Sequence, residues 1–227
     1  MALKSLISQD LPKKFFEIIV VDNNSIDRTR EIIKKFPVRY AFERKRGTIA
    51  ARQKGVDIAK GKIIASADAD TFYPKNWLSE IKKAFEDNPD AIAVCGWIYF
   101  KNTSTFFSHS VALAQEANAA LKRLIGKFPL VYAANFAFKK NALDKIGNYP
   151  KHIPELGDQQ YILYNFFKIG KVLISRKIYC ITSARRHKQG ALKDIFLYNG
   201  WYRIAGFIIN SIFKKEIIPP APAIRER

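Results

Sequence analysis

The chain has 227 residues, of which 48% are hydrophobic, so it is long and apolar enough to fold as one domain with a small appendage and is not a disordered chain. Its formal net charge of +19, from 39 Lys plus Arg against 20 Asp plus Glu, indicates a nucleic acid, an anionic membrane surface or a polyanionic substrate as partner, or reflects a Lys-rich genome. It has no compact Arg-rich arm and no zinc-finger spacing, so we expect no nucleic acid.

Apolar runs and helical patterns alternate along the first third of the chain. We expect, in chain order, a helix over 2–9, a strand over 17–22, a helix over 27–35, a strand over 38–42, a helix over 48–59 and a strand over 62–67. Continuous apolar strands are typical of parallel sheets buried on both faces. The alternation predicts a doubly wound, mostly parallel α/β sheet whose ligands gather at the carboxyl ends of the strands.

The remaining elements continue this pattern and end in a different kind of segment. We expect a helix over 75–88, a strand over 91–97, a helix over 104–126, a strand over 132–138, a helical turn over 140–146, a helix over 158–168 and an extended segment over 171–182. Residues 191–213 alternate apolar and basic side chains, which predicts an amphipathic helix pair that lies on a membrane or packs on the core. We therefore divide the chain into a domain over 1–190 and an amphipathic segment with a loose tail over 191–227.

The cysteines and the apolar stretches bear on the compartment. Cys95 and Cys180 lie far apart in apolar contexts, so we expect no disulfide framework and a reducing, cytoplasmic environment. We expect neither a secretory signal nor a membrane span, because no stretch of about 18 apolar residues occurs. A peripheral position at the inner face of the cell membrane is compatible with the basic charge.

Two acidic residues follow the strand over 62–67 directly. In Asp68-Ala69-Asp70 the two carboxylates are two residues apart, a spacing that places them on one side of an extended strand. Hard oxygen ligands of this kind suit Mg²⁺ or Mn²⁺, and such an ion commonly holds a diphosphate. The alternative is a solvated loop, because Asp is common in turns. Asp22 closes the strand over 17–22, so we expect it at the same edge of the sheet.

An ordered set of stretches over about residues 2–190 resembles the family 2 glycosyltransferases, which have the GT-A fold. The stretches are EIIVVDNNSIDRT at 17–29, AARQKG at 50–55, DAD at 68–70, NFAFKK at 135–140, GDQQ at 157–160 and TSARR at 182–186. The resemblance implies transfer of a sugar, with inversion, from a nucleotide-diphospho-sugar to a hydroxyl of a glycan or lipid-linked acceptor. It also implies a Mn²⁺ or Mg²⁺ cofactor.

The resemblance also implies roles for individual residues. The nucleotide site would contain Asp22, Asn24, Asp27, Arg52 and Asp68. The metal ligands would be Asp70 and His187, and the donor or acceptor would contact Asn135, Glu155, Arg185 and Arg186. The base that deprotonates the acceptor hydroxyl would be Asp158, with Glu155 as the second candidate.

Each of these roles has a structural alternative. Asp22, Asp27 and Asp158 are also residues that cap or begin helices. Arg52 either stacks on a base, pairs with a phosphate, or lies as a surface arginine on its helix. Asn135 is equally compatible with a structural position at a strand end. His187 is a lone histidine, and lone histidines are more often not metal ligands.

The chain departs from the family pattern in two places. Family members open with a central strand that cradles the nucleotide, whereas this chain begins at the helix that follows it, so we expect a gap in the sheet that the tail or another subunit closes. The family often shows Glu-Asp where this chain has Gly157-Asp158. The alternative function is therefore a truncated, non-catalytic relative that keeps the fold as a binding or interaction protein.

Overall fold

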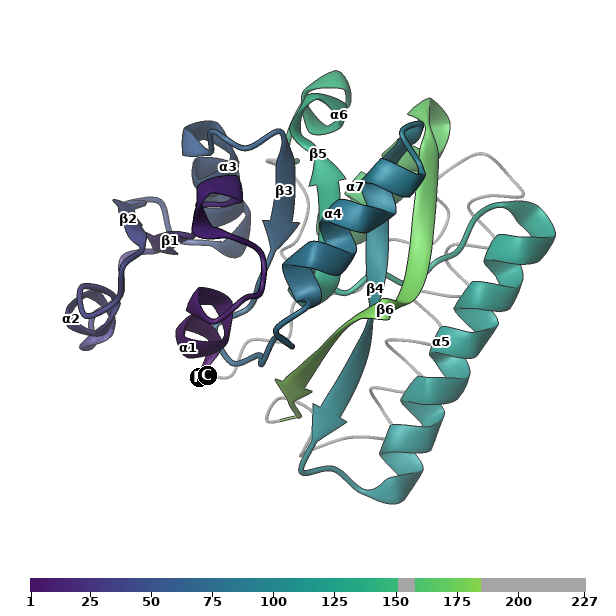
Figure 1. The fold of residues 1–227 in the computed structure, drawn as a ribbon, viewed down its shortest axis with the longest axis horizontal. Helices are drawn as coiled ribbons and strands as arrows, with labels where there is room; N and C mark the ends of the chain where they lie inside the picture. The colour runs from purple at the N-terminus through teal and green to yellow at the C-terminus, as the bar shows by residue number, and fades with distance from the viewer. Residues whose placement is uncertain (151–157, 185–227) are drawn as a thin grey trace.

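The computed structural model describes residues 1–150 and 158–184 (Figure 1). The helices are α1 (Ala2–Ile7), α2 (Thr29–Ile33), α3 (Thr48–Ile58), α4 (Trp77–Asp87), α5 (Thr105–Ile125), α6 (Lys140–Lys145) and α7 (Asp158–Ile169), with the 3-10 turns η1 (Lys13–Phe15) and η2 (Ala133–Asn135). The strands are β1 (Ile19–Asp22), β2 (Arg39–Phe42), β3 (Ile63–Ser66), β4 (Ala91–Lys101), β5 (Phe136–Lys139) and β6 (Lys171–Ser183). The predicted α/β class is confirmed, and the segment over 191–227 lies outside the described residues.

The strands form two sheets. β1 and β2 pair in parallel as a two-stranded sheet, and the other strands form a four-stranded sheet in the order β3-β5-β4-β6. In the larger sheet β4 and β6 are parallel, whereas β5 runs antiparallel to both β3 and β4. The predicted sheet thus contains two parallel strand pairs, and β5 is its antiparallel strand. The apolar pattern could not reveal this, because a strand buried on both faces has the same pattern in either direction.

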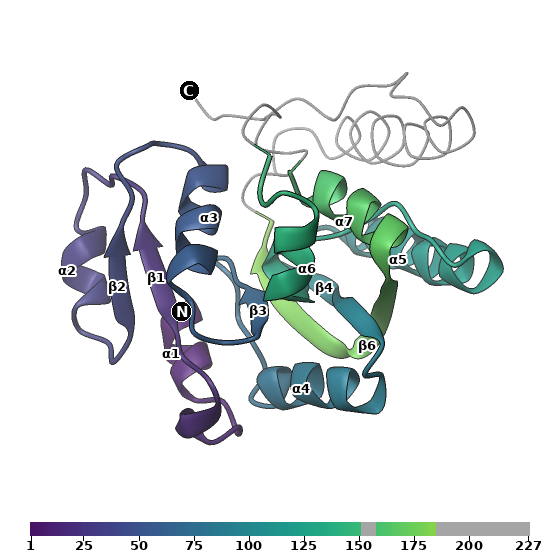
Figure 2. The ribbon, with the colours of Figure 1, turned by 90° about the horizontal axis from the view of Figure 1, so that it is seen from above.

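The break between the two sheets lies at β1 and β3, each of which pairs on one edge only among residues 1–150 and 158–184. In both views the β1–β2 sheet stands beside β3 (Figures 1 and 2). The carbonyls of Ile18 and Asp22 accept hydrogen bonds from the start and the end of β2. Because backbone groups alternate along a strand, those of Ile19 and Val21 face the other way, toward the break. These apolar strand residues are only half-buried, as the expected gap in the sheet predicts.

The same alternation holds on the other side of the break. The carbonyl of Lys62 accepts a hydrogen bond from the amide of Lys140, which follows β5, so the backbone groups of Ile63 and Ala65 face the break. The side chains of β3 are also only half-buried. Two edges, one from each sheet, thus face the break with backbone groups that no strand in the described part of the chain pairs.

Two helices connect the sheets across this break. Leu6 of α1 is buried in the same cluster against which Ile18 and Ile63 pack. On α3, Val56 is buried in a cluster with Ile64 of β3, and a Cβ on Gly55 would lie 3.5 Å from Val21 of β1. α1 and α3 therefore hold β1–β2 against the larger sheet by side-chain packing rather than by strand pairing.

Helices cover both faces of the larger sheet (Figure 2). β4 is buried almost throughout, and its side chains alternate between two apolar clusters. Val94 and Ile98 join the cluster that contains Trp77 of α4, while Cys95 joins the cluster that contains Phe166 of α7. This three-layer core positions the ends of β1 and β3 and the start of α7, where the predicted site residues lie.

Candidate active site

Asp22 closes β1, and its carboxylate already has partners within the protein. It is 4% exposed; its Oδ1 accepts a hydrogen bond from the Ser25 amide at 3.0 Å, and its Oδ2 accepts one from the Tyr40 hydroxyl at 3.1 Å. Burial raises the pKa of the Asp22 carboxyl, but the hydrogen bonds outweigh it, and the pKa lies below its ordinary value. The ionised carboxylate therefore orders the turn after β1.

Asparagine side chains tie the loop after β1 to the loop before α3. Asn23 Nδ2 donates to the carbonyl of Lys45 at 2.6 Å, and Asn23 Oδ1 accepts from the Gly47 amide at 2.7 Å. Asn24 has a φ of 57°, in the left-handed region that asparagine tolerates, and its Nδ2 donates to the carbonyl of Arg44 at 3.5 Å. Asn24 thus lies in a loop of defined shape beside Asp22, and its contact with a nucleotide stays a prediction.

Asp27 is exposed and lies just before α2. Its Oδ1 accepts a hydrogen bond from the Thr29 amide at 2.9 Å, and this bond lowers the pKa of the Asp27 carboxyl. The helix begins at Thr29, two residues after the predicted start. Asp27 thus has a local structural contact at the start of α2, and a contact with a nucleotide stays a prediction.

Asp68 and Asp70 lie in a turn beyond β3, which ends at Ser66. The expectation that they share one side of a strand is therefore wrong, because the alternation of side chains applies only within an extended strand. Both carboxylates are half-buried. Their position after the carboxyl end of β3 agrees with the predicted edge of the sheet.

Buried hydrogen bonds fix this turn in place. The amide of Asp68 donates to the hydroxyl of Tyr73 at 2.8 Å, and that hydroxyl donates to the carbonyl of Ala134 at 3.0 Å. Thr71, which follows Asp70, is fully buried and its hydroxyl bonds that of Thr182 near the end of β6 at 2.8 Å. The turn that carries the two carboxylates is thus anchored to η2 and β6.

The donor chemistry of this turn fits a divalent cation. Mg²⁺ is usually held by one or two carboxylates together with substrate phosphates, and Asp68 and Asp70 supply such oxygens. Within residues 1–150 and 158–184 no cluster of three His, Cys, Asp or Glu side chains could hold an ion without further ligands. The remaining ligands would therefore come from a bound diphosphate or from residues outside those ranges.

Arg52 of α3 and Asp158 at the start of α7 form an ion pair between residues far apart in the chain. The distance from Arg52 Nη1 to Asp158 Oδ2 is 2.5 Å, and the two side chains are 21% and 2% exposed. Burial lowers the pKa of Arg52, but the charges of Asp158, Tyr149 and Asp68 outweigh it and raise the pKa. Arg52 therefore lies in the field of both the predicted base and the acidic turn after β3.

A second residue of α3 holds the segment before residue 151. Gln53 Oε1 accepts a hydrogen bond from the Tyr149 amide at 3.0 Å, and Gln53 Nε2 lies 3.3 Å from Asn148 Oδ1. Tyr149 is buried; burial raises its pKa to about 12, although Gln159 and Arg52 act to lower it. Gln159 Nε2 donates to Asp158 Oδ2 at 3.1 Å. Consecutive side chains of α3 thus fix the two chain segments on either side of residues 151–157.

The sequence did not single out Tyr40, Gln53, Tyr149 or Gln159 as site residues. The contact of Tyr40 with Asp22 spans 18 positions and that of Gln53 with Tyr149 spans 96, and no local pattern encodes such pairs. Gln159 bonds its direct neighbour Asp158. Both hydrogen bonds that the described residues make to the Asp158 carboxylate end on Oδ2. Asp158 Oδ1 takes part in neither of these two bonds.

Asn135 is buried at the end of η2 and connects three parts of the core. Its Oδ1 accepts a hydrogen bond from Trp77 Nε1 at 2.8 Å, and its Nδ2 donates to the carbonyls of Trp97 at 2.7 Å and Ile178 at 3.1 Å. A Cβ on Gly96 would lie 2.2 Å from Asn135 Nδ2, so only glycine leaves room for this amide. These contacts support the structural alternative for Asn135.

We expect Asn135→Ala to lower the free energy of unfolding by about 3 kcal/mol, because three buried partners lose their hydrogen bonds at once. Urea unfolding monitored by circular dichroism measures the change. Asn141→Ala, on the exposed face of α6, is the matched control and should change stability by less than about 0.5 kcal/mol. Unchanged stability with loss of activity would instead indicate a direct contact with substrate.

Four predicted site residues lie outside the described residues: Glu155, Arg185, Arg186 and His187. Among the others, the structure brings Arg52 and Asp158 into contact and places Asp68 within electrostatic reach of Arg52. Asp22, Asn24 and Asp27 lie together in the turn after β1.

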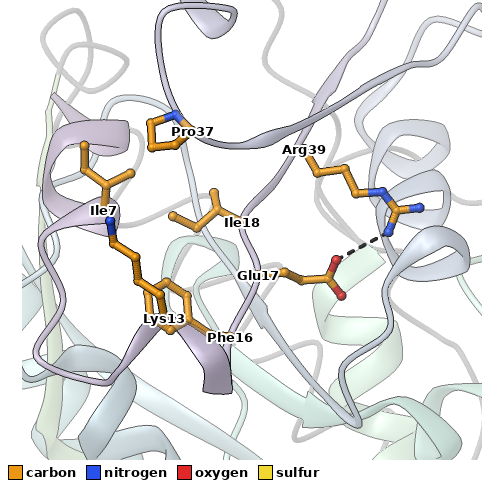
Figure 3. A pocket seen from close by; sticks show the side chains of 7 residues that line it. All are labelled: Ile7, Lys13, Phe16, Glu17, Ile18, Pro37 and Arg39. Carbon is orange, nitrogen blue, oxygen red and sulfur yellow. Dashed lines mark hydrogen bonds and ion pairs between the residues drawn. The ribbon is translucent and has the colours of Figure 1, made fainter.

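A pocket of about 240 Å³ lies at the other end of β1 (Figure 3). Ile7, Phe16, Ile18 and Pro37 give it apolar walls, and the ion pair between Arg39 Nη1 and Glu17 Oε2, at 3.3 Å, lies beside them (Figure 3). None of the predicted site residues lines it. Its place before β1 separates it from the strand end where Asp22 lies.

Comparison with known proteins gives consistent results. The chain is 27% identical over 167 residues to the glycosyltransferase AglE of Haloferax volcanii, an alignment that covers 69% of this chain and 53% of AglE. The fold matches the mannosyltransferase PcManGT of Pyrobaculum calidifontis, solved with GDP-Man and Mn²⁺, with a TM-score of 0.69, 19% identity, and coverage of 96% of this chain and 60% of that one. It also matches S. aureus TarS solved with UDP-GlcNAc, with a TM-score of 0.62, 18% identity, and coverage of 81% and 54%.

The chain thus covers only part of the curated relatives that it matches, from 28% to 53% of their length. The family model for glycosyl transferase family 2 matches residues 1–147. This match covers more than half of the chain and includes the β1 turn, α3 and the acidic turn after β3. The chain belongs to glycosyl transferase family 2.

Proposed function

We propose that this chain transfers a sugar from a nucleotide-diphospho-sugar to an acceptor hydroxyl, with inversion and with a divalent cation. The observation that carries the proposal is the Arg52–Asp158 ion pair within the field of Asp68. It joins the residue proposed as base to the end of the sheet where a donor diphosphate would lie. Membership of family 2 supports the same reaction class.

Asp158 is proposed as the base. Its Oδ1 takes the proton of the acceptor hydroxyl, and the resulting oxygen attacks the anomeric carbon from the side opposite the diphosphate. The bond from the anomeric carbon to the diphosphate oxygen breaks, and the nucleoside diphosphate leaves with that electron pair. One displacement of this kind inverts the anomeric carbon. The ion pair with Arg52 and the hydrogen bond from Gln159 keep the carboxylate oriented.

Arg52 is proposed to bind the donor and to orient the proposed base. The Arg52 side chain is 21% exposed, whereas the carboxylate that its guanidinium contacts is nearly fully buried. A planar guanidinium binds phosphate oxygens in a defined geometry and stays charged at every relevant pH. It would therefore attract the donor diphosphate while its other donors hold Asp158 in place.

Asp70 is a proposed metal ligand. Asp68 is proposed to contact the ribose or a metal-bound water. When bound, Mn²⁺ or Mg²⁺ would neutralise the charge that grows on the departing diphosphate. Asp22, Asn24 and Asp27 are proposed to contact the base and ribose from the β1 turn. The oxygen-only donor set of the acidic turn supports a hard cation over a softer one.

The acceptor is proposed to be a glycan or a lipid-linked sugar. The net charge of +19 supports an anionic or membrane-bound acceptor over a neutral one in solution. Glu155, Arg185 and Arg186 are proposed to contact the donor or the acceptor, and His187 is proposed as a metal ligand together with Asp70.

A second candidate function is that of a non-catalytic relative that keeps the fold as a binding protein. The break between β1 and β3 favours it, because the nucleotide residues after β1 belong to a two-stranded sheet. Two-stranded sheets are marginally stable and hold a binding loop less rigidly.

The first test is stabilisation by nucleotide. We expect UDP or GDP to raise Tm by about 5–10 °C near 100 Kd, and only with Mn²⁺, because a ligand bound to the folded state alone stabilises it by about 2.7 kcal/mol at that concentration. Differential scanning fluorimetry measures the shift. Asp70→Ala should abolish it, while Asp87→Ala on the exposed end of α4 should not. The same shift without metal, or no shift with either nucleotide, contradicts the proposal.

A further inference from the structure

Helix α5 is apolar on the side that faces away from the core. Phe106, Leu113 and Leu124 are 60%, 72% and 80% exposed, although large apolar side chains are usually covered. Ala117 and Ala120, also exposed, lie between the two leucines along the helix. The spacings of seven, four, three and four residues place all five side chains on one line along α5. We call this line the α5 stripe; it extends for about 27 Å.

The opposite side of α5 is fixed to the core, so the stripe cannot turn inward. Gln115 exchanges two hydrogen bonds with the backbone of Ile98, at 2.8 and 3.0 Å. Asn118 does the same with the backbone of Leu130, at 2.8 and 3.0 Å. All of these groups are buried, and a rotation of α5 would leave them without partners, which is unfavourable for buried polar groups.

The surroundings of the stripe are basic. Between residues 101 and 127 the chain carries Lys101, Lys122, Arg123 and Lys127 against a single acidic residue, Glu116. Glu116 forms an ion pair with Arg176 of β6, which neutralises it. Arg123 and Lys127 are exposed at the end of α5 and Lys101 precedes its start, whereas Lys122 lies on the other side of the helix, near Cys95 and Lys171. The stripe is therefore an apolar line with basic residues near both of its ends. A second copy of this chain would bring like charges together, whereas an anionic surface would be attracted.

The stripe begins where the chain leaves β6. Ser183, the last residue of β6, pairs with Lys101, and α5 begins four residues later at Thr105 (Figure 1). The residues after Ala184 include the apolar and basic sequence over 191–213. The two regions have the same combination of apolar and basic side chains in the sequence.

We propose that the α5 stripe docks on the surface of an anionic lipid bilayer, with α5 lying in the plane of the surface. A helix of this kind binds through buried apolar area together with attraction of its basic residues to anionic headgroups. Among residues 1–150 and 158–184, no helix is long and apolar enough to cross a bilayer. The proposed contact is with the surface of the bilayer. This surface would hold the described domain beside lipid-linked molecules.

Vesicle flotation of the full chain tests the proposal. We expect binding to vesicles of phosphatidylcholine with phosphatidylglycerol, weaker binding to phosphatidylcholine alone, and loss of binding at high salt. The double variant Leu113→Glu and Leu124→Glu should bind the anionic vesicles at least about tenfold more weakly, because two leucines leave the apolar phase. Ile26→Glu with Ile32→Glu, at positions 93% and 52% exposed far from α5, makes the same charge change and should lose much less.

Equal losses in the two double variants, or no binding of the unchanged chain to anionic vesicles, would overturn the proposal. Cysteine labelling without lipid tests whether another part of the chain or a second copy already covers the stripe. In the variants Leu113→Cys and Ile26→Cys, maleimide should label the new cysteine at similar rates in solution, because both positions are exposed. Cys95 and Cys180 are buried and should add little background labelling. Slow labelling at position 113 would mean that the stripe is already covered. A labelling rate that does not depend on protein concentration would indicate residues 185–227 as the cover, and a rate that falls with protein concentration would indicate a second copy. Either result overturns docking on lipid.

Discussion

Asp158→Asn is expected to lower kcat by about 10³-fold, because the variant keeps the shape of the side chain but cannot take a proton. The measurement is release of nucleoside diphosphate from whichever sugar nucleotide stabilises the chain. Donor binding should be nearly unchanged, since Asp158 is proposed to contact the acceptor. Asp144→Asn on the exposed side of α6 is the control and should keep full activity.

Stability must be separated from chemistry in this experiment. Asp158→Asn leaves Arg52 without its buried counter-charge, a loss that typically costs about 3–5 kcal/mol. The double variant Asp158→Asn with Arg52→Gln removes both charges and should recover most of the lost Tm. Neither variant should recover kcat. A folded double variant whose kcat stays within tenfold of the parent would falsify the role of Asp158 as base.

Closing the break between the sheets is expected to raise Tm by about 10 °C. The change is an extended apolar strand of five residues joined ahead of Met1 through a short glycine-serine linker. Such a strand would pair with the free backbone groups of Ile19 and Val21 on one side and of Ile63 and Ala65 on the other. New hydrogen bonds and burial of half-exposed strand residues, less the cost of ordering the strand, should give about 3–5 kcal/mol net.

The readout is Tm by calorimetry together with hydrogen exchange at the four amides that face the break. These amides should exchange fast in the unchanged chain and slowly after the strand is added. The control is the same extension with proline at alternate positions, which cannot pair on both edges. If the proline control stabilises equally, or if the four amides are already protected, the edges are not free and the expectation fails.

The elements themselves were determined by the sequence. The apolar run that ends at Asp22, the helical spacing over 48–59 and the long helix over 104–126 appear where periodicity placed them, because each pattern buries one face and those faces do not depend on distant residues. The family was also readable from the order of short motifs. Boundaries differed by a few residues, as at α2, which begins at Thr29, while Asp27 lies before the helix and accepts a hydrogen bond from the Thr29 amide.

Only the tertiary structure decided the strand directions and the contacts of the site. β5 lies antiparallel between β3 and β4, although its apolar pattern suits either direction. Arg52 and Asp158 are 106 positions apart, and Asn135 joins α4, β4 and β6. Such contacts arise when packing of the two apolar clusters brings distant polar groups together, and burial then requires each group to find a partner. Local patterns encode the faces of the elements, whereas the pairing of buried polar groups depends on how those faces pack.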